Sequence, residues 1–203
     1  MKKSLLMLPL VLLVTALALT ACGGGGSSSS GGGSDETAIS KAIEESVTTT
    51  DPSKCTKYQT EAFNEQDARE SNNPLKSCEE SAESNEEPAE SVNVSNIEID
   101  SETATAQAEI EGSSLNGQSV EIEMAKEEGA WKLNQFIEFS SYEGKGLGET
   151  LTKELEKEGE VSASLAKCVG EGFAEISQQE AEAVIFAGEA EGLEELAKSC
   201  QSE

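Results

Sequence analysis

The chain has 203 residues, of which 14 are lysine or arginine and 40 are aspartate or glutamate, so its formal net charge is −26. A surface this acidic repels nucleic acid, which excludes nucleic acid as an expected partner. Histidine is absent, and this excludes serine–histidine–aspartate catalysis, cysteine–histidine catalysis and zinc sites built on imidazole. The spacings of an EF-hand, a Walker loop and a dinucleotide fingerprint are also missing, so we expect neither a metal nor a cofactor.

The first residues have the order of an export signal. Two lysines precede an apolar run over residues 5–19, and small residues follow it up to Cys22. The run is shorter than the ~20 apolar residues that a membrane-spanning helix needs. Residues 19–22 read Leu-Thr-Ala-Cys, which resembles the lipobox of bacterial lipoproteins. The resemblance implies a signal peptide over residues 1–21 and a diacylglyceryl group on Cys22.

Residues 23–34 contain only glycine and serine. Such a segment behaves as a flexible coil with a reach of roughly 19 Å. We therefore expect residues 22–34 to tether a folded part to the extracytoplasmic side of a bacterial envelope membrane. Removal of the signal peptide takes away two lysines, which leaves 12 basic and 40 acidic residues and a net charge of −28. Because this charge repels anionic headgroups, we expect the lipid on Cys22 to be the membrane contact.

Two helices are predicted after the tether. Apolar residues at every fourth position predict a helix that ends near residue 48. Asp51-Pro52 predicts the start of a second helix, because aspartate caps free amides and proline suits the first helical position. The apolar side chains assigned to these helices are Ile39, Ile43, Val47, Cys55, Tyr58, Ala62 and Phe63. Leu75 and Cys78 predict a brief helical contact, and the acidic residues 79–90 are expected to form an exposed loop.

Four strand-like segments follow, and they cover residues 92–99, 103–110, 120–124 and 131–139. The connections between them are short, and one contains Asn116-Gly117. Short connections join antiparallel neighbours, so the segments predict a meander with one buried face. Gln135 interrupts the alternation and predicts a bulge, and Trp131 is expected in the core.

Helices are predicted in the last quarter of the chain. The glycines of residues 144–148 predict a hinge, and residues 147–203 predict a small helical domain behind it. An apolar stripe at helical spacing contains Cys168 and Phe173, and residues 177–180 form a capping box.

Four cysteines remain besides Cys22, and an even number in an exported chain predicts disulfides with three possible pairings. We favour Cys55–Cys78 and Cys168–Cys200, because each pair falls within one segment on either side of the glycine-rich break. The second pair also lies on apolar stripes of helices that are expected to pack together. Thiol exchange and metal binding are the alternatives, but the chain has no Cys-x-x-Cys spacing.

Four short motifs over residues 38–140 occur in an order that resembles nuclear-transport-factor-2-like domains of small actinobacterial-type lipoproteins. They are Asp51-Pro52-Ser53-Lys54-Cys55, Val92-Asn93-Val94-Ser95-Asn96-Ile97, Ala104-Thr105-Ala106 and Gly129-Ala130-Trp131-Lys132-Leu133. The resemblance implies an α+β domain over residues 35–143. In it, two or three N-terminal helices pack on a curved, cone-like antiparallel meander with a pocket between them. Relatives include dehydratases, isomerases and cyclases that commonly use histidine with aspartate, so no catalytic residue is transferred to this chain.

These observations predict a lipid-anchored envelope protein that binds a small apolar ligand or another envelope protein and is not an enzyme. One alternative is a hydrolase or isomerase of the same fold that uses a buried carboxylate. Another is a purely structural surface protein. The pocket distinguishes them: one filled by its own side chains leaves no room for a ligand, whereas an open apolar pocket with a buried glutamate favours the enzyme.

Overall fold

The structure is a computed structural model that describes residues 32–69, 71–84, 88–159, 161–189 and 191–201. The predicted signal peptide, Cys22 and the tether up to residue 31 lie outside the described residues. Across the ranges described, none of the helices has the length and apolar character that a membrane crossing requires.

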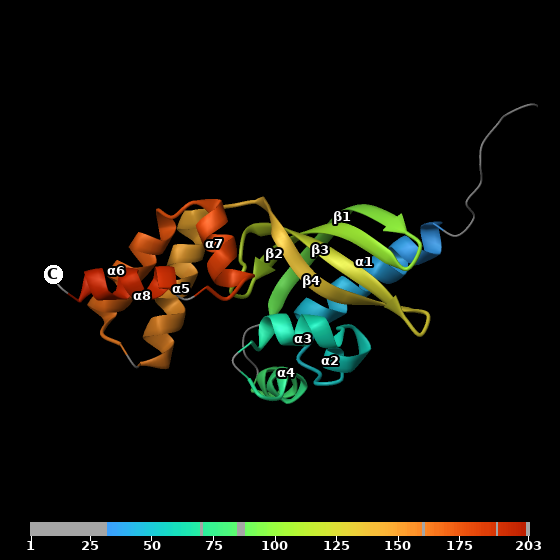
Figure 1. Cartoon of the computed structure of the whole chain (residues 1–203), viewed down its shortest axis with the longest axis horizontal. Coiled ribbons are helices and arrows are strands. Elements are labelled where there is room, and N and C mark those ends of the chain that lie inside the picture. The colour runs from blue at the N-terminus through green and yellow to red at the C-terminus, as the bar shows by residue number, and fades with distance from the viewer. Residues whose placement is uncertain (1–31, 70, 85–87, 160, 190, 202–203) are drawn as a thin grey trace, which may run out of the picture. The chain divides into compact units, whose positions relative to one another are not determined.

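The described residues form eight helices and one four-stranded sheet, which confirms a mixed α+β fold (Figure 1). The helices are α1 (Gly32–Thr48), α2 (Lys54–Lys57), α3 (Glu61–Asp67), α4 (Pro74–Glu83), α5 (Gly144–Glu158), α6 (Ala163–Ala174), α7 (Gln178–Ile185) and α8 (Glu191–Cys200). The strands are β1 (Ala89–Asp100), β2 (Thr103–Gly112), β3 (Gln118–Glu127) and β4 (Ala130–Ser141). Four helices precede the sheet in the described residues, rather than the two or three predicted.

The sheet is the predicted meander, with strand order β1-β2-β3-β4 and antiparallel pairing throughout. Alternate residues of β2 and β3 face the core; they are Ala104, Ala106, Ala108, Ile110, Val120, Ile122 and Met124. The register of β4 skips Asn134, Ile137 and Ser140, so this strand carries three irregularities. Gln135 itself is paired, and the predicted bulge lies one residue before it. Extra residues of this kind bend a strand and increase its twist.

Helix α1 contacts β1 and β4 and supplies Ile39 and Ile43 to the core (Figure 1). Trp131 is buried as predicted. Its Nε1 donates a hydrogen bond of 3.0 Å to Asp35 Oδ1, which fixes the first turns of the helix to β4. The helix begins at Gly32, so it includes the last three residues of the predicted tether. The Thr37 hydroxyl donates to the carbonyl of residue 33, which helps these residues join the helix.

The single helix predicted after Asp51-Pro52 is two helices, α2 and α3. The chain between them is extended, because Leu133 N donates to Tyr58 O and Thr60 N donates to Leu133 O. Thr60 then caps α3 by accepting a hydrogen bond from Phe63 N. Because of this break, α3 does not continue the buried face of α2, and Phe63 is buried as predicted but Ala62 is exposed.

The prediction that residues 79–90 form an exposed acidic loop is wrong. Helix α4 continues to Glu83, and β1 begins at Ala89. Ala82 and Ala89 are both buried. Small apolar residues among many glutamates therefore mark the inner faces of a helix and a strand, while the glutamates face solvent.

The predicted glycine hinge is the beginning of helix α5. A Cβ atom built on Gly148 would lie 2.3 Å from Gly170 O, and one on Gly144 would lie 2.7 Å from Ala174 O. The glycines therefore allow α5 and α6 to approach closely. The capping box that opens α7 is confirmed.

The C-terminal helices share a core with the sheet. Phe173 and Phe186 belong to the same buried cluster as the inner residues of the strands. Helix α7 also bonds to the backbone of Phe139, whose N donates to Glu182 Oε1 and whose O accepts from Gln178 Nε2. The segment Gly31–Glu203 forms one compact unit. Independent folding of residues 147–203 stays a prediction.

Both favoured cysteine pairs are disulfides in the structure. Cys55–Cys78 joins α2 to α4 across a separation of 23 residues. Cys168–Cys200 joins α6 to α8 across 32 residues. The first of these lies beside the pocket described below.

Candidate functional site

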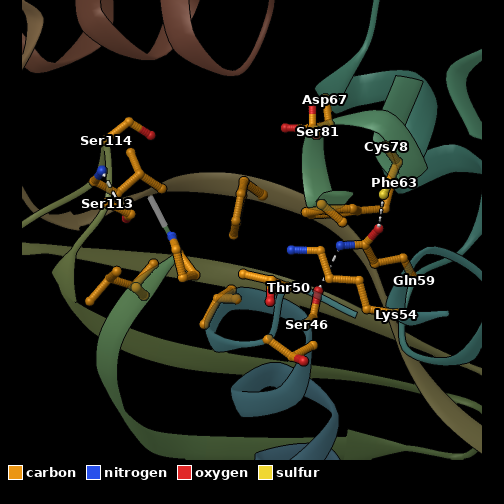
Figure 2. A pocket seen from close by; sticks show the side chains of 18 residues that line it. Ser46, Thr50, Lys54, Gln59, Phe63, Asp67, Cys78, Ser81, Ser113 and Ser114 are labelled. Atoms are coloured by element: carbon orange, nitrogen blue, oxygen red, sulfur yellow. Dashed lines mark hydrogen bonds between the residues drawn. The ribbon is translucent and has the colours of Figure 1, made fainter. Parts of the chain in front are cut away.

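A pocket of about 220 Å³ lies between the N-terminal helices and the inner face of the sheet (Figure 2). We call it the inner pocket. Its polar lining is Ser46, Thr49, Thr50, Lys54, Gln59, Asp67, Ser81, Ser113 and Ser114. The rest of its lining is Val47, Phe63, Cys78, Ala82, Pro88, Ala89, Ile110, Leu115 and Phe136. The pocket is therefore half polar, and it is not filled by the protein's own side chains.

Gln59 forms part of the buried polar wall of the inner pocket. Its backbone is fixed as the bridge to Leu133, and its side chain is only 5% exposed. Gln59 Nε2 donates a hydrogen bond of 2.8 Å to Ser46 Oγ. Gln59 Oε1 lies 3.1 Å from Cys78 Sγ, which is a sulfur–oxygen contact because a disulfide sulfur has no hydrogen to donate. This wall is therefore rigid and connected to the disulfide.

Lys54 brings a positive charge into the inner pocket. It begins α2, next to the disulfide at Cys55, and its half-buried side chain extends toward the middle of the hollow (Figure 2). Burial lowers the pKa of Lys54, and the negative charge of Asp67 partly opposes this shift. Asp67 ends α3 and is exposed at the other side of the lining.

The apolar wall of the inner pocket is continuous with the core. The rings of Phe63 and Phe136 pack edge to face, with their centroids 5.1 Å apart. Phe136 also contacts Phe186 of the C-terminal region at 5.7 Å. Gln66 accepts from Phe136 N and donates to Phe136 O, which holds the irregular part of β4 in place. The pocket therefore depends on the C-terminal helices for part of its support.

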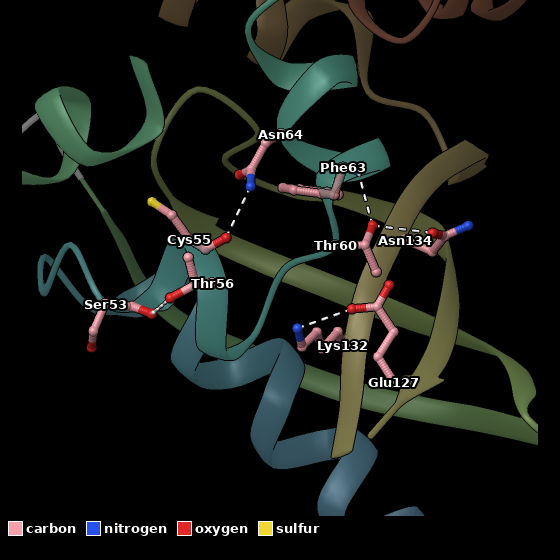
Figure 3. Close-up of polar contacts among 9 residues, drawn as sticks. All are labelled: Ser53, Cys55, Thr56, Thr60, Phe63, Asn64, Glu127, Lys132 and Asn134. Atoms are coloured by element: carbon pink, nitrogen blue, oxygen red, sulfur yellow. Dashed lines mark hydrogen bonds and ion pairs between the residues drawn. The ribbon is translucent and has the colours of Figure 1, made fainter. Parts of the chain in front are cut away.

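A second hollow, of about 500 Å³, lies on the other side of the disulfide, and we call it the outer hollow. Its lining is Cys55, Thr56, Gln59, Glu61, Asn64, Asn73, Pro74, Leu75, Glu127 and Lys132. Its lysine is already neutralised, because Lys132 Nζ pairs with Glu127 Oε2 at 3.0 Å (Figure 3). Asn64 Nδ2 donates to Cys55 O, and its Oδ1 is buried without a hydrogen-bond partner in the part of the chain that the structure describes. Glu61, which is exposed, also lines the outer hollow, so the charge that this hollow presents is negative.

In the part of the chain that the structure describes, neither hollow is lined by a buried carboxylate. Among the described residues, none of the aspartates and glutamates is buried. Asp67 is the carboxylate that lines the inner pocket, and it is exposed. The same residues contain no group of three acidic or cysteine side chains placed to hold a metal ion. The hydrolase or isomerase alternative, which needs a buried carboxylate, therefore gains no support.

The site residues predicted from the sequence do not lie together in the structure. Cys22 lies outside the described residues. Cys78 lines the inner pocket and Cys55 lines the outer hollow, whereas Cys168 and Cys200 line neither. Tyr142 also lines neither hollow; it donates a hydrogen bond to Ile176 O and packs on Phe139, between the sheet and the C-terminal helices.

Sequence reasoning singled out Val47, Phe63 and Cys78 but missed the polar residues that line the inner pocket. Lys54 lies inside the motif around Asp51-Pro52, but only folding shows which way its side chain points. The one available signal was its rarity, since only 14 residues of this acidic chain are basic. Neither a family model, a curated protein nor a solved structure matches the chain. Function must therefore be argued from the site itself.

Proposed function

We propose that this chain is a lipid-anchored bacterial envelope protein that binds a small ligand in its inner pocket and does not act as an enzyme. The observation that carries the binding proposal is the inner pocket, which lies between helices and sheet and has a half-buried lysine directed into it. Binding sites commonly combine an apolar lining with a few polar groups that orient the ligand. The mixed lining favours a ligand with a polar end over a purely apolar one.

The anchoring proposal is supported by the sequence. The lipobox-like Leu-Thr-Ala-Cys ends the apolar run, and the glycine–serine tether follows it directly. Several acyl chains on Cys22 hold a protein stably at a membrane, whereas a single chain binds reversibly. The two disulfides agree with an oxidising compartment on the outer side of that membrane.

Binding is tested by native mass spectrometry of the protein purified from the envelope of its own cells. We expect a mass increase that corresponds to one bound small molecule. Ser81→Phe places a ring in the inner pocket and is expected to remove the added mass. Glu83→Phe, on the exposed side of the same helix and outside the lining, is the matched control. Ligand-free protein in both wild type and control would contradict the proposal.

Anchoring is tested by cell fractionation. Cys22→Ala removes the thiol that accepts the lipid, so the protein is expected to leave the membrane fraction at high salt. Ser27→Ala in the tether preserves the lipobox and is the control. Retention of the Cys22→Ala protein at the membrane after a salt wash would contradict lipid anchoring.

A further inference from the structure

Lys54 is the one cationic side chain that lines the inner pocket in the described residues. The Cys55–Cys78 disulfide holds its short helix against α4, and the Lys54 side chain extends into the pocket (Figure 2). Within the described ranges, its ammonium has no hydrogen bond and no ion pair at bonding distance. A half-buried ammonium loses part of its hydration, and the more distant charge of Asp67 replaces that interaction only in part. A bound anion would restore that interaction.

Ser46 supplies a suitable second contact for an anion. It lines the same pocket and is only 2% exposed. Its Oγ accepts the hydrogen bond from Gln59 Nε2, which leaves the hydroxyl hydrogen available to donate. A carboxylate has two oxygens that accept hydrogen bonds, and charge-assisted hydrogen bonds are about twice as strong as neutral ones. The polar part of the pocket therefore matches a carboxylate.

The apolar part of the pocket indicates the chemistry and the size of the rest of the ligand. Ile110 and Phe63 are buried, and the partly buried Leu115 completes this wall. An apolar cavity of about 150 Å³ holds benzene. The inner pocket measures about 220 Å³, so it has room for a molecule of roughly nine non-hydrogen atoms by the same scale. A chain of seven or eight carbons that ends in a carboxylate is close to this size.

We infer that the inner pocket takes a small monocarboxylate amphiphile, with its carboxylate on Lys54 and Ser46 and its apolar chain against Ile110 and Leu115. The inference rests on the proposed function, because it names the ligand class for the same pocket. Asp67 limits the charge of the ligand, since its carboxylate lines the same hollow and repels a second negative charge. A single carboxylate with an uncharged chain satisfies all of these groups.

The test uses three ligands of matched length, which are octanoate, 1-octanol and octylammonium. Their affinities are measured by titration calorimetry on the segment Gly31–Glu203, a compact unit, exported so that its disulfides form. Salt of about 0.15 M screens the long-range repulsion between this acidic surface and the anion. We expect octanoate to bind at least tenfold more tightly than octanol and octylammonium to bind most weakly.

Lys54→Met removes the charge but keeps a long side chain. We expect this change to weaken octanoate about tenfold or more while octanol changes less than about twofold, because only the anion loses a charge-assisted hydrogen bond. Lys57→Met on the same helix is the control; it makes the same change in net charge, but Lys57 is exposed and outside the lining. Asp67→Asn is expected to strengthen octanoate binding.

The outcomes separate the two proposals. Tight octanol binding that Lys54→Met does not affect would overturn the anionic ligand but keep the pocket as a binding site. Equal losses in the Lys54→Met and Lys57→Met proteins would overturn the contact with Lys54. Absence of binding by all three ligands, together with ligand-free protein from the envelope, would overturn the proposed function as well. Circular dichroism and thermal unfolding of each variant confirm that it folds.

Discussion

Two glycines in helix α5 give opposite predictions, although they lie two residues apart. A Cβ atom on Gly146 would lie no closer than 3.6 Å to its neighbours, which is an ordinary contact. One on Gly148 would lie 2.3 Å from Gly170 O and 2.9 Å from Ala174 Cβ. The shortest ordinary contact is 3.4 Å, so Gly148→Ala must push α5 and α6 apart by roughly 1 Å.

We expect Gly146→Ala to raise the free energy of unfolding by about 0.5–1 kcal/mol, because alanine lowers the entropy of the unfolded chain and favours helix. Overpacking costs about 1–3 kcal/mol. After the same helix gain is subtracted, Gly148→Ala is expected to lower the free energy of unfolding by up to about 2.5 kcal/mol, or the Tm by up to about 10 °C. Urea and thermal unfolding of the segment Gly31–Glu203 measure the change in stability that each substitution causes. Equal stabilisation by the two substitutions would refute close helix packing and support the hinge predicted from the sequence.

Two further predictions concern the ends of the fold. The hydrogen bond from Trp131 Nε1, followed by the one from Lys126 Nζ, holds the pKa of Asp35 below its ordinary value of 3.8. This carboxylate therefore stabilises the fold above that value and loses its contribution as the pH falls through the lowered pKa. The Tm difference between wild type and Asp35→Asn should be present at pH 7 and vanish in stronger acid; a difference independent of pH would contradict the assignment. Replacing Cys168 and Cys200 together by serine opens a loop with a sequence separation of 32 residues and is expected to cost about 3–4 kcal/mol in urea unfolding. An unchanged urea midpoint would show that the crosslink does not stabilise the fold.

Patterns that depend on near neighbours in the sequence predicted the structure well. The meander followed from alternating apolar residues and short connections, because both act within and between adjacent strands. The capping box before α7 was also predicted, since its two hydrogen bonds join residues 177 and 180 alone.

Features that depend on distant contacts could not be predicted. The break between α2 and α3 exists because Tyr58 and Thr60 bond to Leu133, more than 70 residues away by number. The glycines of α5 resemble a hinge locally, and only the position of α6 shows that Gly144 and Gly148 permit close packing. Tertiary contacts therefore outweighed the local sequence preference in both cases: they divided one predicted helix, and they placed a helix where a hinge was predicted.

The inner pocket illustrates the same limit. Gln59 and Lys54 are ordinary surface residues by composition, and they become pocket residues because a bridge to β4 and a disulfide to α4 turn them inward. The sequence predicted both cysteines of that disulfide and the strand that carries Leu133. It did not indicate that these features enclose a space.

The most direct test of the central claim is a crystal structure of the segment Gly31–Glu203 grown with octanoate. The account predicts electron density for the ligand in the inner pocket, with a carboxylate oxygen within hydrogen-bonding distance of Lys54 Nζ. Clear density in the outer hollow beside Asn64, or an inner pocket closed by its own side chains, would contradict it.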